Sequence, residues 1–461
     1  MKKQPSNIAI IGGGIAGLSA AYYLQQFAPN TEFVLFEKNN HLGGNIQTRT
    51  EQGFLYETGP DAFLHKPIME ELISELALEN ELIATNKENR KLYLVKNGSL
   101  VEVPKAFYLM GPSKLLPFLF SSAFSFSTKL RTLMEPLIPT KKIDEDESLA
   151  SFVTRRFGKG NLEEITQSMI GGIYTADPSN LSLQSTLPRF IEWEQKYGSV
   201  LRGLQKEMRN RDARGPQYNQ FRSFQSGMQI LIDAMEKTIP FSKIQKNALV
   251  QSIDRENQLW NIRVNGKKYT FDHLIMATPV RATVHLSNFL PTQAKQLLKS
   301  VQYSSCAILH FGFRKNQIAH DIAAMGMIVP NREKRSILAS TFCSEKFAER
   351  SENDLVLLRV FMGGTLNQEL LQESDDTLFH HALRDLKELL RIESDPIYQN
   401  ILRWPDSMPQ YTLGHKARMI EFHESIRNIE NVQFVGNTYE GVGIPDLIER
   451  SKKIVTGLLD V

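Results

Sequence analysis

The residues with the clearest chemical use are the glycines near the start of the chain, and they indicate the binding of a dinucleotide. Gly12, Gly14 and Gly17 form a G-x-G-x-x-G motif. In such a motif the first glycine allows a tight turn, the second lets the backbone approach a pyrophosphate, and the third lets a helix pack closely on a strand. Glu37 lies 20 residues beyond Gly17, where a carboxylate can accept hydrogen bonds from both ribose hydroxyls. The stretch expected to hold the cofactor is Gly12, Gly13, Gly14, Ile15, Ala16 and Gly17.

These glycines can bind a dinucleotide only if a buried strand precedes them and a helix follows. The apolar run 7–11 predicts a buried parallel strand, residues 15–27 have helical spacing, and residues 33–36 predict a second strand that ends at Glu37. The helix N-terminus would offer N–H groups and the positive end of its dipole to the phosphates. An acid in that place disfavours the extra phosphate of NADP. The alternative is a glycine-rich turn in an unrelated α/β fold.

A second glycine pair favours FAD over NAD. Gly43 and Gly44 follow shortly after Glu37 and Lys38 in the segment His41-Leu42-Gly43-Gly44. A pair in this place resembles the second phosphate-contact loop of flavoproteins that have two dinucleotide domains.

Length and composition narrow the class of protein. A chain of 461 residues predicts two or three domains. The 54 basic and 51 acidic residues give a formal charge of +3, which is too small to indicate binding to nucleic acid. Cys306 and Cys343 are the only cysteines, too few for a disulfide framework or a cysteine-based metal site, so we expect reduced thiols and no metal.

The chain has no strong membrane or export signal. The first strand begins within seven residues of the start, so we expect a cytoplasmic protein. No stretch reaches the roughly 18 apolar residues of a membrane span. The most apolar stretch, 106–139, is interrupted by Pro112, Lys114, Pro117 and Lys129. We expect it in the core or in a substrate pocket, with peripheral contact at the inner face of the cell membrane as an alternative.

The rest of the chain alternates helical and strand patterns. Helices are predicted at 68–76, 152–172, 227–235, 379–390 and 445–459, the last with Pro445 in its first turn. Residues 92–95 and 100–103 predict a hairpin. Further strands are predicted at 248–253, 260–264, 272–279, 306–313, 338–342, 355–361 and 432–435.

Five stretches resemble the oxygen-dependent protoporphyrinogen or coproporphyrinogen oxidases of bacterial type, FAD enzymes of haem synthesis in the monoamine-oxidase-like group. Generic amine oxidases share only the first and last of these stretches, so the middle three indicate the subfamily. The stretches are 59–67 (GPDAFLHKP), 172–178 (GIYTADP), 188–199 (PRFIEWEQKYGS), 408–415 (MPQYTLGH) and 441–446 (GVGIPD).

The resemblance implies an α/β and α+β fold: a two-dinucleotide-domain flavoprotein with a Rossmann-like FAD domain, a substrate domain with a mixed sheet, and a helical insertion. The FAD domain is expected in three parts, 1–65, 221–285 and 406–461. Residues 66–220 are expected to form the helical insertion, which contacts substrate or membrane, and residues 286–405 the substrate domain.

The resemblance also implies which residues hold the FAD. Besides the first glycine motif, Glu37, Lys38, Gly43 and Gly44, it implies Gly59 and Pro60. Val250 would contact the adenine through its backbone. Trp404, Gly436 and the turn Ile444-Pro445-Asp446 would lie against the flavin. A helix that begins at this turn could stabilise negative charge on the reduced ring system.

The implied substrate residues are Lys66, Phe361 and Gly172. An ammonium at Lys66 suits a propionate carboxylate, and Phe361 would lie beside the tetrapyrrole rings. Plant relatives have an arginine at the position of Leu92, which cannot bind a carboxylate, so other groups must bind the propionates. No catalytic base can be named, and His310 and His415 are expected to be structural.

The implied reaction converts protoporphyrinogen IX to protoporphyrin IX in three two-electron steps, with oxygen as acceptor and hydrogen peroxide released. The alternative substrate is coproporphyrinogen III, which would give coproporphyrin III. Remoter alternatives are an FAD amine oxidase or desaturase with another substrate, and a non-catalytic flavin-bound scaffold. The expected partners are the porphyrinogen and oxygen, with hand-over to ferrochelatase and homo-oligomer formation left open.

Overall fold

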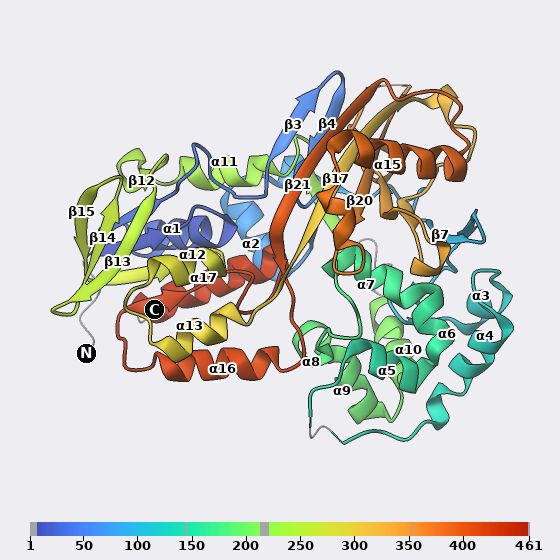
Figure 1. Cartoon of the computed structure of the whole chain (residues 1–461), viewed down its shortest axis with the longest axis horizontal. Helices are drawn as coiled ribbons and strands as arrows, with labels where there is room; N and C mark the ends of the chain where they lie inside the picture. Colours follow the sequence, from blue (N-terminus) through green and yellow to red (C-terminus); the bar gives the residue numbers. More distant parts are fainter. Residues whose placement is uncertain (1–6, 143–144, 213–220, 353, 460–461) are drawn as a thin grey trace.

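The computed structural model describes residues 7–142, 145–212, 221–352 and 354–459. Figure 1 shows one lobe on the left, with the first and last described residues, and a second mass on the right with a large sheet above and a group of helices below. The chain crosses between these parts several times, so residues far apart in sequence meet at the junction.

The left lobe is built on a parallel sheet of five strands in the order β12-β2-β1-β16-β22. Its strands come from three separate parts of the chain, as the sequence pattern predicts for a discontinuous Rossmann-like unit. Apolar side chains of α1, α11 and α17 cover one face. The elements are β1 Asn7–Ile11, α1 Ile15–Phe27, β2 Glu32–Phe36, α11 Gln229–Lys237, β12 Ile244–Gln245, β16 His273–Met276, β22 Val432–Phe434 and α17 Ile444–Leu459.

The other face of this sheet is covered by a second apolar cluster. It contains side chains from an antiparallel sheet of three strands and from three helices. These are β13 Val250–Glu256, β14 Leu259–Val264, β15 Lys267–Phe271, α12 Val280–Leu286, α13 Thr292–Lys299 and α16 His415–Ser425.

A mixed sheet of seven strands forms the upper part of the right side, in the order β21-β17-β20-β19-β18-β7-β8. Only the β18–β7 pair in it is parallel. Helix α15 packs on one face, and the other face is turned to the junction. The elements are β7 Leu92–Lys96, β8 Ser99–Glu102, β17 Tyr303–Arg314, β18 Gly326–Ile328, β19 Ile337–Phe342, β20 Leu355–Gly363, α15 Asp375–Leu390 and β21 Tyr398–Pro409.

The predicted hairpin exists, but it belongs to this sheet. The sequence division groups residues 92–103 with the helical insertion, whereas β7 pairs directly with β18 from the substrate part of the chain. The pairing buries Leu94 and Val95, which would be exposed on an isolated hairpin. The division of the chain into domains otherwise stays a proposal.

The helical lobe differs from the sequence prediction in one place. We expected one helix over 152–172, but α5 ends at Phe157 because Gly158 adopts φ +89. The chain then continues through the short helix α6 and a π-helical turn, Leu162–Thr166, into α7. The helices are α3 Leu115–Phe120, α4 Phe126–Leu133, α5 Leu149–Phe157, α6 Lys159–Asn161, α7 Gln167–Tyr174, α8 Leu183–Thr186, α9 Pro188–Tyr197 and α10 Val200–Asp212.

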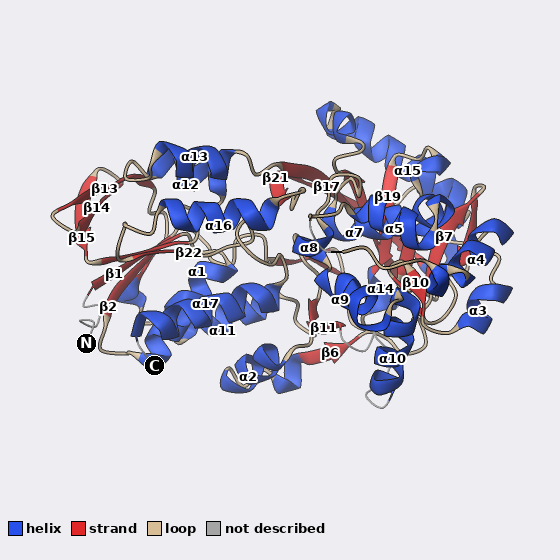
Figure 2. Cartoon of the chain, turned by 90° about the horizontal axis from the view of Figure 1, so that it is seen from below, coloured by secondary structure: helices blue, strands red, loops and turns tan. Residues whose placement is uncertain are grey.

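A small antiparallel sheet of three strands lies where the lobes meet. Its order is β5-β11-β6, and Figure 2 shows β6 and β11 between the two lobes, with α2 alongside. Within the described ranges, no helix has the length and apolar content needed to cross a bilayer. The elements are β5 Phe63–Leu64, α2 Pro67–Glu75, β6 Leu82–Ala84 and β11 Phe221–Phe224.

Candidate active site

The first glycine loop has the geometry that its spacing predicts. Gly12 follows β1 with φ +104, and a Cβ there would lie 2.6 Å from the Ala277 carbonyl oxygen. A Cβ at Gly17 would lie 1.9 Å from the Gly12 carbonyl oxygen, so helix α1 can pack on the loop only if this residue is glycine. Both glycines are therefore required by the protein itself.

Gly14 has a different environment from these two glycines. It is the N-cap of α1, with φ −64 and ψ 174, and no atom lies within 4 Å of where its Cβ would be. Gly436, which follows β22, faces similar open space. Neither glycine is needed to avoid a clash within the protein, although the φ of +141 at Gly436 favours glycine there. The open surface at Gly14, beside the N-terminus of α1, fits an anionic group such as a pyrophosphate.

Glu37 is fixed at the carboxyl end of β2. Its Oε2 accepts a hydrogen bond from the Gly13 N–H at 2.7 Å, and its Oε1 accepts one from the Asn39 N–H at 2.8 Å. Only 8% of the residue is exposed. A carboxylate oxygen has a second lone pair, so both oxygens can still accept from the hydroxyls of a ribose.

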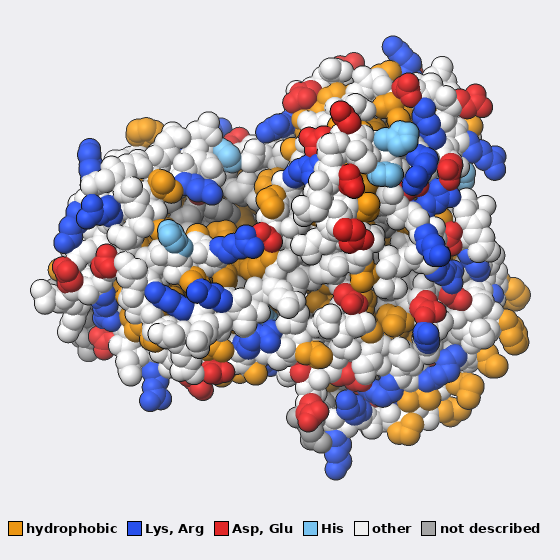
Figure 3. Space-filling view, in the orientation of Figure 1, with side chains coloured by type: hydrophobic (Ala, Val, Ile, Leu, Met, Phe, Trp, Pro, Cys, Tyr) orange, Lys and Arg blue, Asp and Glu red, His pale blue; other side chains and the backbone are white. Residues whose placement is uncertain are grey.

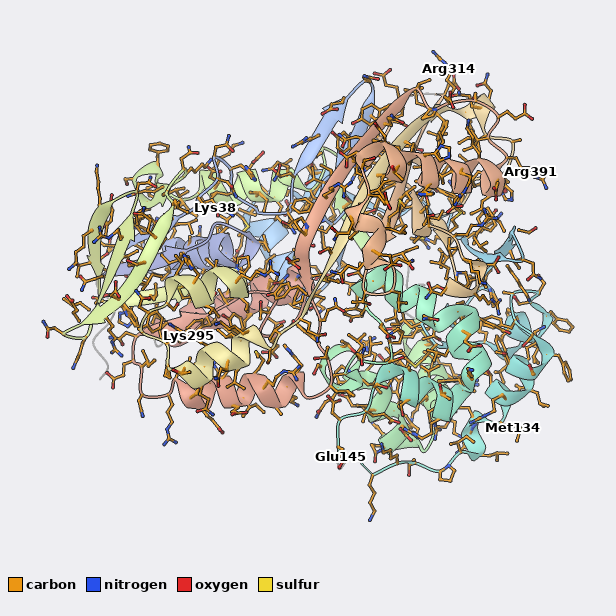
Figure 4. All side chains as sticks on the ribbon, in the orientation of Figure 1. Lys38, Met134, Glu145, Lys295, Arg314 and Arg391 are labelled. Atoms are coloured by element: carbon orange, nitrogen blue, oxygen red, sulfur yellow. The ribbon has the colours of Figure 1, made fainter. Side chains whose placement is uncertain are left out.

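The second glycine pair lies directly against the first loop. The Gly43 N–H donates to the Gly13 carbonyl oxygen at 2.8 Å, and a Cβ at Gly44 would lie 3.4 Å from the Gly14 Cα. Val250 begins β13 near Glu37, because the Ala248 N–H donates to the Glu37 carbonyl oxygen. Lys38 is exposed and lies on the left lobe in Figure 4.

The C-terminal turn contacts the predicted substrate loop. Helix α17 begins at Ile444, with Pro445 and Asp446 in its first turn. The Asp446 carboxylate forms an ion pair with the Lys66 ammonium, 380 residues away in sequence. Lys66 is the N-cap of α2. The structure thus brings a predicted substrate residue against a predicted flavin residue.

Two side chains of the seven-stranded sheet hold the segment that contains Gly59 and Pro60. Trp404 Nε1 donates to the Thr58 carbonyl oxygen at 2.8 Å, and Arg359 Nη2 donates to the Gly59 carbonyl oxygen. A Cβ at Gly59 would lie 2.0 Å from the Asn45 carbonyl oxygen, so this segment also packs against the second glycine loop. The segment at Gly59 and the second glycine loop are therefore fixed to the seven-stranded sheet.

The sequence did not identify Arg359 or the residues that it contacts as part of the site. Arg359 Nη1 lies 4.0 Å from Asp61 Oδ1, and Lys346 Nζ lies 2.7 Å from Asp61 Oδ2. Burial alone would raise the pKa of Asp61, but the charges of Lys346 and Arg359 outweigh it and lower the pKa to about 2. The available signals in the sequence were a lone cation in the apolar run of β20 and, separately, the acid Asp61 in the stretch 59–67.

Six paired residues, one on each of six adjacent strands of the sheet, form an apolar row on the face turned to the junction. Directly opposed residues on adjacent strands point to the same face. At its β7 end the row packs against the helical lobe in a cluster that includes Phe107, Ile165 and Met169, and Phe361 is half-buried at the margin of that cluster. The row consists of Leu94, Ile328, Ala339, Phe361, Ile308 and Leu402.

Gly172 lies on α7, in the helical lobe. No atom lies within 4 Å of where its Cβ would be, and the residue is exposed. One turn further on, the Thr175 carbonyl oxygen accepts from the Thr365 N–H at 3.0 Å, close to the end of the strand that carries Phe361. The loop after α7 therefore lies beside the end of this strand, while the substrate roles of Gly172 and Phe361 stay predictions.

The two histidines expected to be structural are buried and favour the neutral form. Burial keeps the pKa of His310 well below its usual range, with a further contribution from the charge of Arg359. Burial lowers the pKa of His415 to about 4, and its ring stacks on Tyr411 with the ring centres 4.1 Å apart. The described residues contain no group of three or more potential metal ligands.

A separate cavity of about 950 Å³ lies between α12, α13, the start of β17, the end of β21 and the segment after α7. None of the residues predicted to bind flavin or substrate lines it. The face shown in Figure 3 is hollowed between the left lobe and the right side.

The comparisons with known proteins agree on the family and extend over the whole chain. The profile described as flavin-containing amine oxidoreductase matches residues 15–454. The chain is similar to a coproporphyrinogen III oxidase of Bacillus subtilis (31% identity, 100% of this chain and 99% of the relative) and to one of Staphylococcus aureus (30%, 97% of each). The crystal structure of a putative protoporphyrinogen oxidase from Exiguobacterium superposes with a TM-score of 0.86 at 27% identity and covers 99% of both chains.

Proposed function

The chain belongs to the flavin-containing amine oxidoreductase family, and from that membership we propose that it is an FAD-dependent oxidase that converts a porphyrinogen to a porphyrin in haem biosynthesis. The observation that carries this proposal is the end-to-end similarity to a coproporphyrinogen III oxidase. The cofactor is a flavin, and the loops around Gly14 and Gly43 fit the dinucleotide form, FAD.

Removal of six hydrogens from the porphyrinogen takes three two-electron steps, each of which reduces one molecule of oxygen to hydrogen peroxide. Bound FAD supplies the two-electron redox chemistry. The chain's own residues bind and orient the reactants. Gly14 and the α1 N-terminus would hold the pyrophosphate, Glu37 the ribose, and the first turn of α17 the flavin ring. Phe361 and Leu402, the half-buried members of the apolar row, would lie beside the macrocycle.

We propose coproporphyrinogen III as the preferred substrate, although the sequence alone favours protoporphyrinogen IX. The two bacterial relatives with the identities given above are both named coproporphyrinogen III oxidase. Coproporphyrinogen has four propionates, whereas protoporphyrinogen has two propionates and two vinyl groups. Because the two porphyrinogens differ in their number of carboxylates, the preference for one of them would depend on the number of cations at the junction.

The test uses purified, yellow protein and both porphyrinogens, each prepared by chemical reduction. Under air, porphyrin fluorescence should rise well above the rate of spontaneous oxidation, and three molecules of hydrogen peroxide should form per porphyrin. We expect a higher kcat/KM for coproporphyrinogen III. If a fully flavin-loaded preparation accelerates neither oxidation, the proposed function is wrong.

We further propose that the enzyme works in contact with the inner face of the cell membrane. Seven large apolar side chains between residues 116 and 137 are exposed, and Phe120 and Phe126 are 86% and 81% exposed. Figure 3 shows apolar side chains gathered over α3 and α4 at the lower right, the same edge on which Figure 4 labels Met134. Lys114 precedes these side chains in the sequence and Lys129 lies among them, which suits an anionic lipid surface.

Sedimentation with vesicles tests this contact. The enzyme should bind vesicles that contain about a third anionic lipid more strongly than zwitterionic ones, because Lys114 and Lys129 attract anionic headgroups. Burial of each phenylalanine adds roughly 1.5–3 kcal/mol on either surface. Replacing Phe120 and Phe126 by serine should reduce binding at least tenfold without loss of flavin. The matched control is Phe241→Ser, since Phe241 is equally exposed but lies in the other lobe. Equal binding by all forms would contradict the proposal.

A further inference from the structure

Two arginines lie at the junction of the lobes. Arg222, in β11, is paired opposite Ala84 of β6. Strand β5, which pairs with the other edge of β11, runs directly into His65 and Lys66. Arg90 comes from the segment that links β6 to β7. Figure 2 shows β6 and β11 between the two lobes and beside α2, the helix that Lys66 caps.

The charges in this group act on one another. Burial lowers the pKa of Arg90. Burial lowers the pKa of Arg222, and the charge of Arg90 lowers it further. Burial also lowers the pKa of His65, and the charge of Arg222 lowers it further, while the charge of Glu70 has a weaker, opposite effect. These repulsions show that positive potential is concentrated at this point of the junction, which favours the binding of an anion.

The guanidinium of Arg90 has unused hydrogen-bonding capacity. Its Nε and Nη2 are both buried, and neither has an acceptor among the residues that the structure describes. A buried charged donor without a partner is costly for the folded protein, so the Arg90 guanidinium favours an acceptor beyond the residues that the structure describes, such as a bound anion. A carboxylate is the matching group, because its two oxygens accept from two nitrogens of one guanidinium.

We propose that Arg90 and Arg222 form a binding site for a carboxylate of the substrate. This inference rests on the proposed function, under which the carboxylate is a propionate of the porphyrinogen. Leu92 packs in the same cluster as Phe361, so the strand that begins next to Arg90 leads onto the apolar face expected to carry the macrocycle.

The first test is kinetic. Arg90→Gln and Arg222→Gln should each raise KM for coproporphyrinogen III roughly ten- to a hundredfold with little change in kcat, because a remote carboxylate is bound alike in the ground and transition states. Arg90→Lys should recover part of the loss, since it keeps the charge but not the forked geometry. Arg314→Gln is the control, an exposed arginine at the far end of β17 in Figure 4.

Wild-type KM in both glutamine variants would overturn the inference while leaving the proposed function intact. Failure of the wild type to produce porphyrin would instead refute the proposed function, whatever the variants do. The two outcomes are therefore distinguishable.

The second test separates binding from a structural role. Coproporphyrin III binding, followed by quenching of its fluorescence, should weaken in Arg90→Met to the same degree as KM rises. Binding of its tetramethyl ester, in dilute non-ionic detergent, should be unchanged. Arg90→Met should unfold at the same or a higher temperature than the wild type, since it removes a buried unpaired cation. A lower unfolding temperature with equal losses for acid and ester would show that Arg90 is structural and would overturn the inference.

Discussion

Substitution of Gly14 by alanine gives a sharp test of where the cofactor's pyrophosphate lies. Gly14 has φ −64 and ψ 174, which alanine adopts without strain, and nothing lies within 4 Å of the added methyl group. The flavin-free protein should therefore be as stable as the wild type or gain about 0.4–1 kcal/mol from the reduced freedom of the unfolded chain. The only group that the methyl can obstruct is a bound ligand.

The expected loss of affinity follows from that obstruction. A methyl group at Gly14 would hold a pyrophosphate away from the α1 N-terminus and weaken its charge-assisted hydrogen bonds, each worth about 1.5–3 kcal/mol. Loss of two such bonds raises the Kd for FAD by roughly 10²- to 10⁴-fold. Gly17→Ala should behave differently, because its Cβ would lie 1.9 Å from the Gly12 carbonyl oxygen. Overpacking of that kind destabilises the protein itself, by about 1–3 kcal/mol or more.

The assay compares flavin-free proteins by FAD titration, with quenching of flavin fluorescence as the signal, and by thermal unfolding without FAD. Gly457→Ala is the matched control, since its Cβ would also meet no atom and it lies in helix α17. It should stabilise the protein by up to about 1 kcal/mol and leave FAD binding unchanged. If Gly14→Ala binds FAD like the wild type, the pyrophosphate does not lie against Gly14.

Three further outcomes follow from the site. Glu37→Gln should lower FAD content in the purified protein by at least tenfold, measured by absorbance, because the amide accepts fewer hydrogen bonds from the ribose. Lys66→Ala should raise KM for the porphyrinogen about ten- to a hundredfold with little loss of kcat, and unchanged kinetics would show that the ion pair with Asp446 is the whole role of Lys66. Burial raises the pKa of Glu57 from its ordinary 4.5 to about 7, so wild-type stability should fall by roughly 3 kcal/mol between those pH values and no further above them. Glu57→Gln should remove that fall in denaturant unfolding, and parallel curves for the two proteins would contradict it.

The parts of the site that the sequence predicts are those made by neighbouring residues. The β1–α1–β2 unit is confirmed to within one residue, and Glu37 lies where the spacing requires, because a single strand–turn–helix sets all these positions. The glycines differ in what requires them, however. Periodicity cannot reveal that Gly17 avoids a clash while Gly14 faces open space, since that depends on how the helix packs on the sheet.

Strand β21 shows why other parts could not be predicted. It runs from Tyr398 to Pro409 and includes Pro405, and prolines within an apolar run ordinarily argue against a strand. Pro405 is tolerated here because β21 is the edge strand of the described seven-stranded sheet, and because its register with β17 shifts between Trp404 and Met408, which leaves Pro405 unpaired. Trp404 reaches Thr58 from this edge, a contact over 346 residues that no local pattern contains.

Residues 58–66 connect the part of the site that is predicted to bind flavin with the part that is predicted to bind substrate. Their beginning is fixed between the second glycine loop and the side chains of Trp404 and Arg359, and their end lies at Asp446 and next to β11. A carboxylate bound beside this end would therefore be held at a set distance from the flavin by a short, heavily anchored segment. Substrate choice can then change through cations around the end of the segment, such as Arg90, while the flavin-binding loops stay the same. Under the proposed function, such cations would distinguish a porphyrinogen with four propionates from one with two propionates and two vinyl groups.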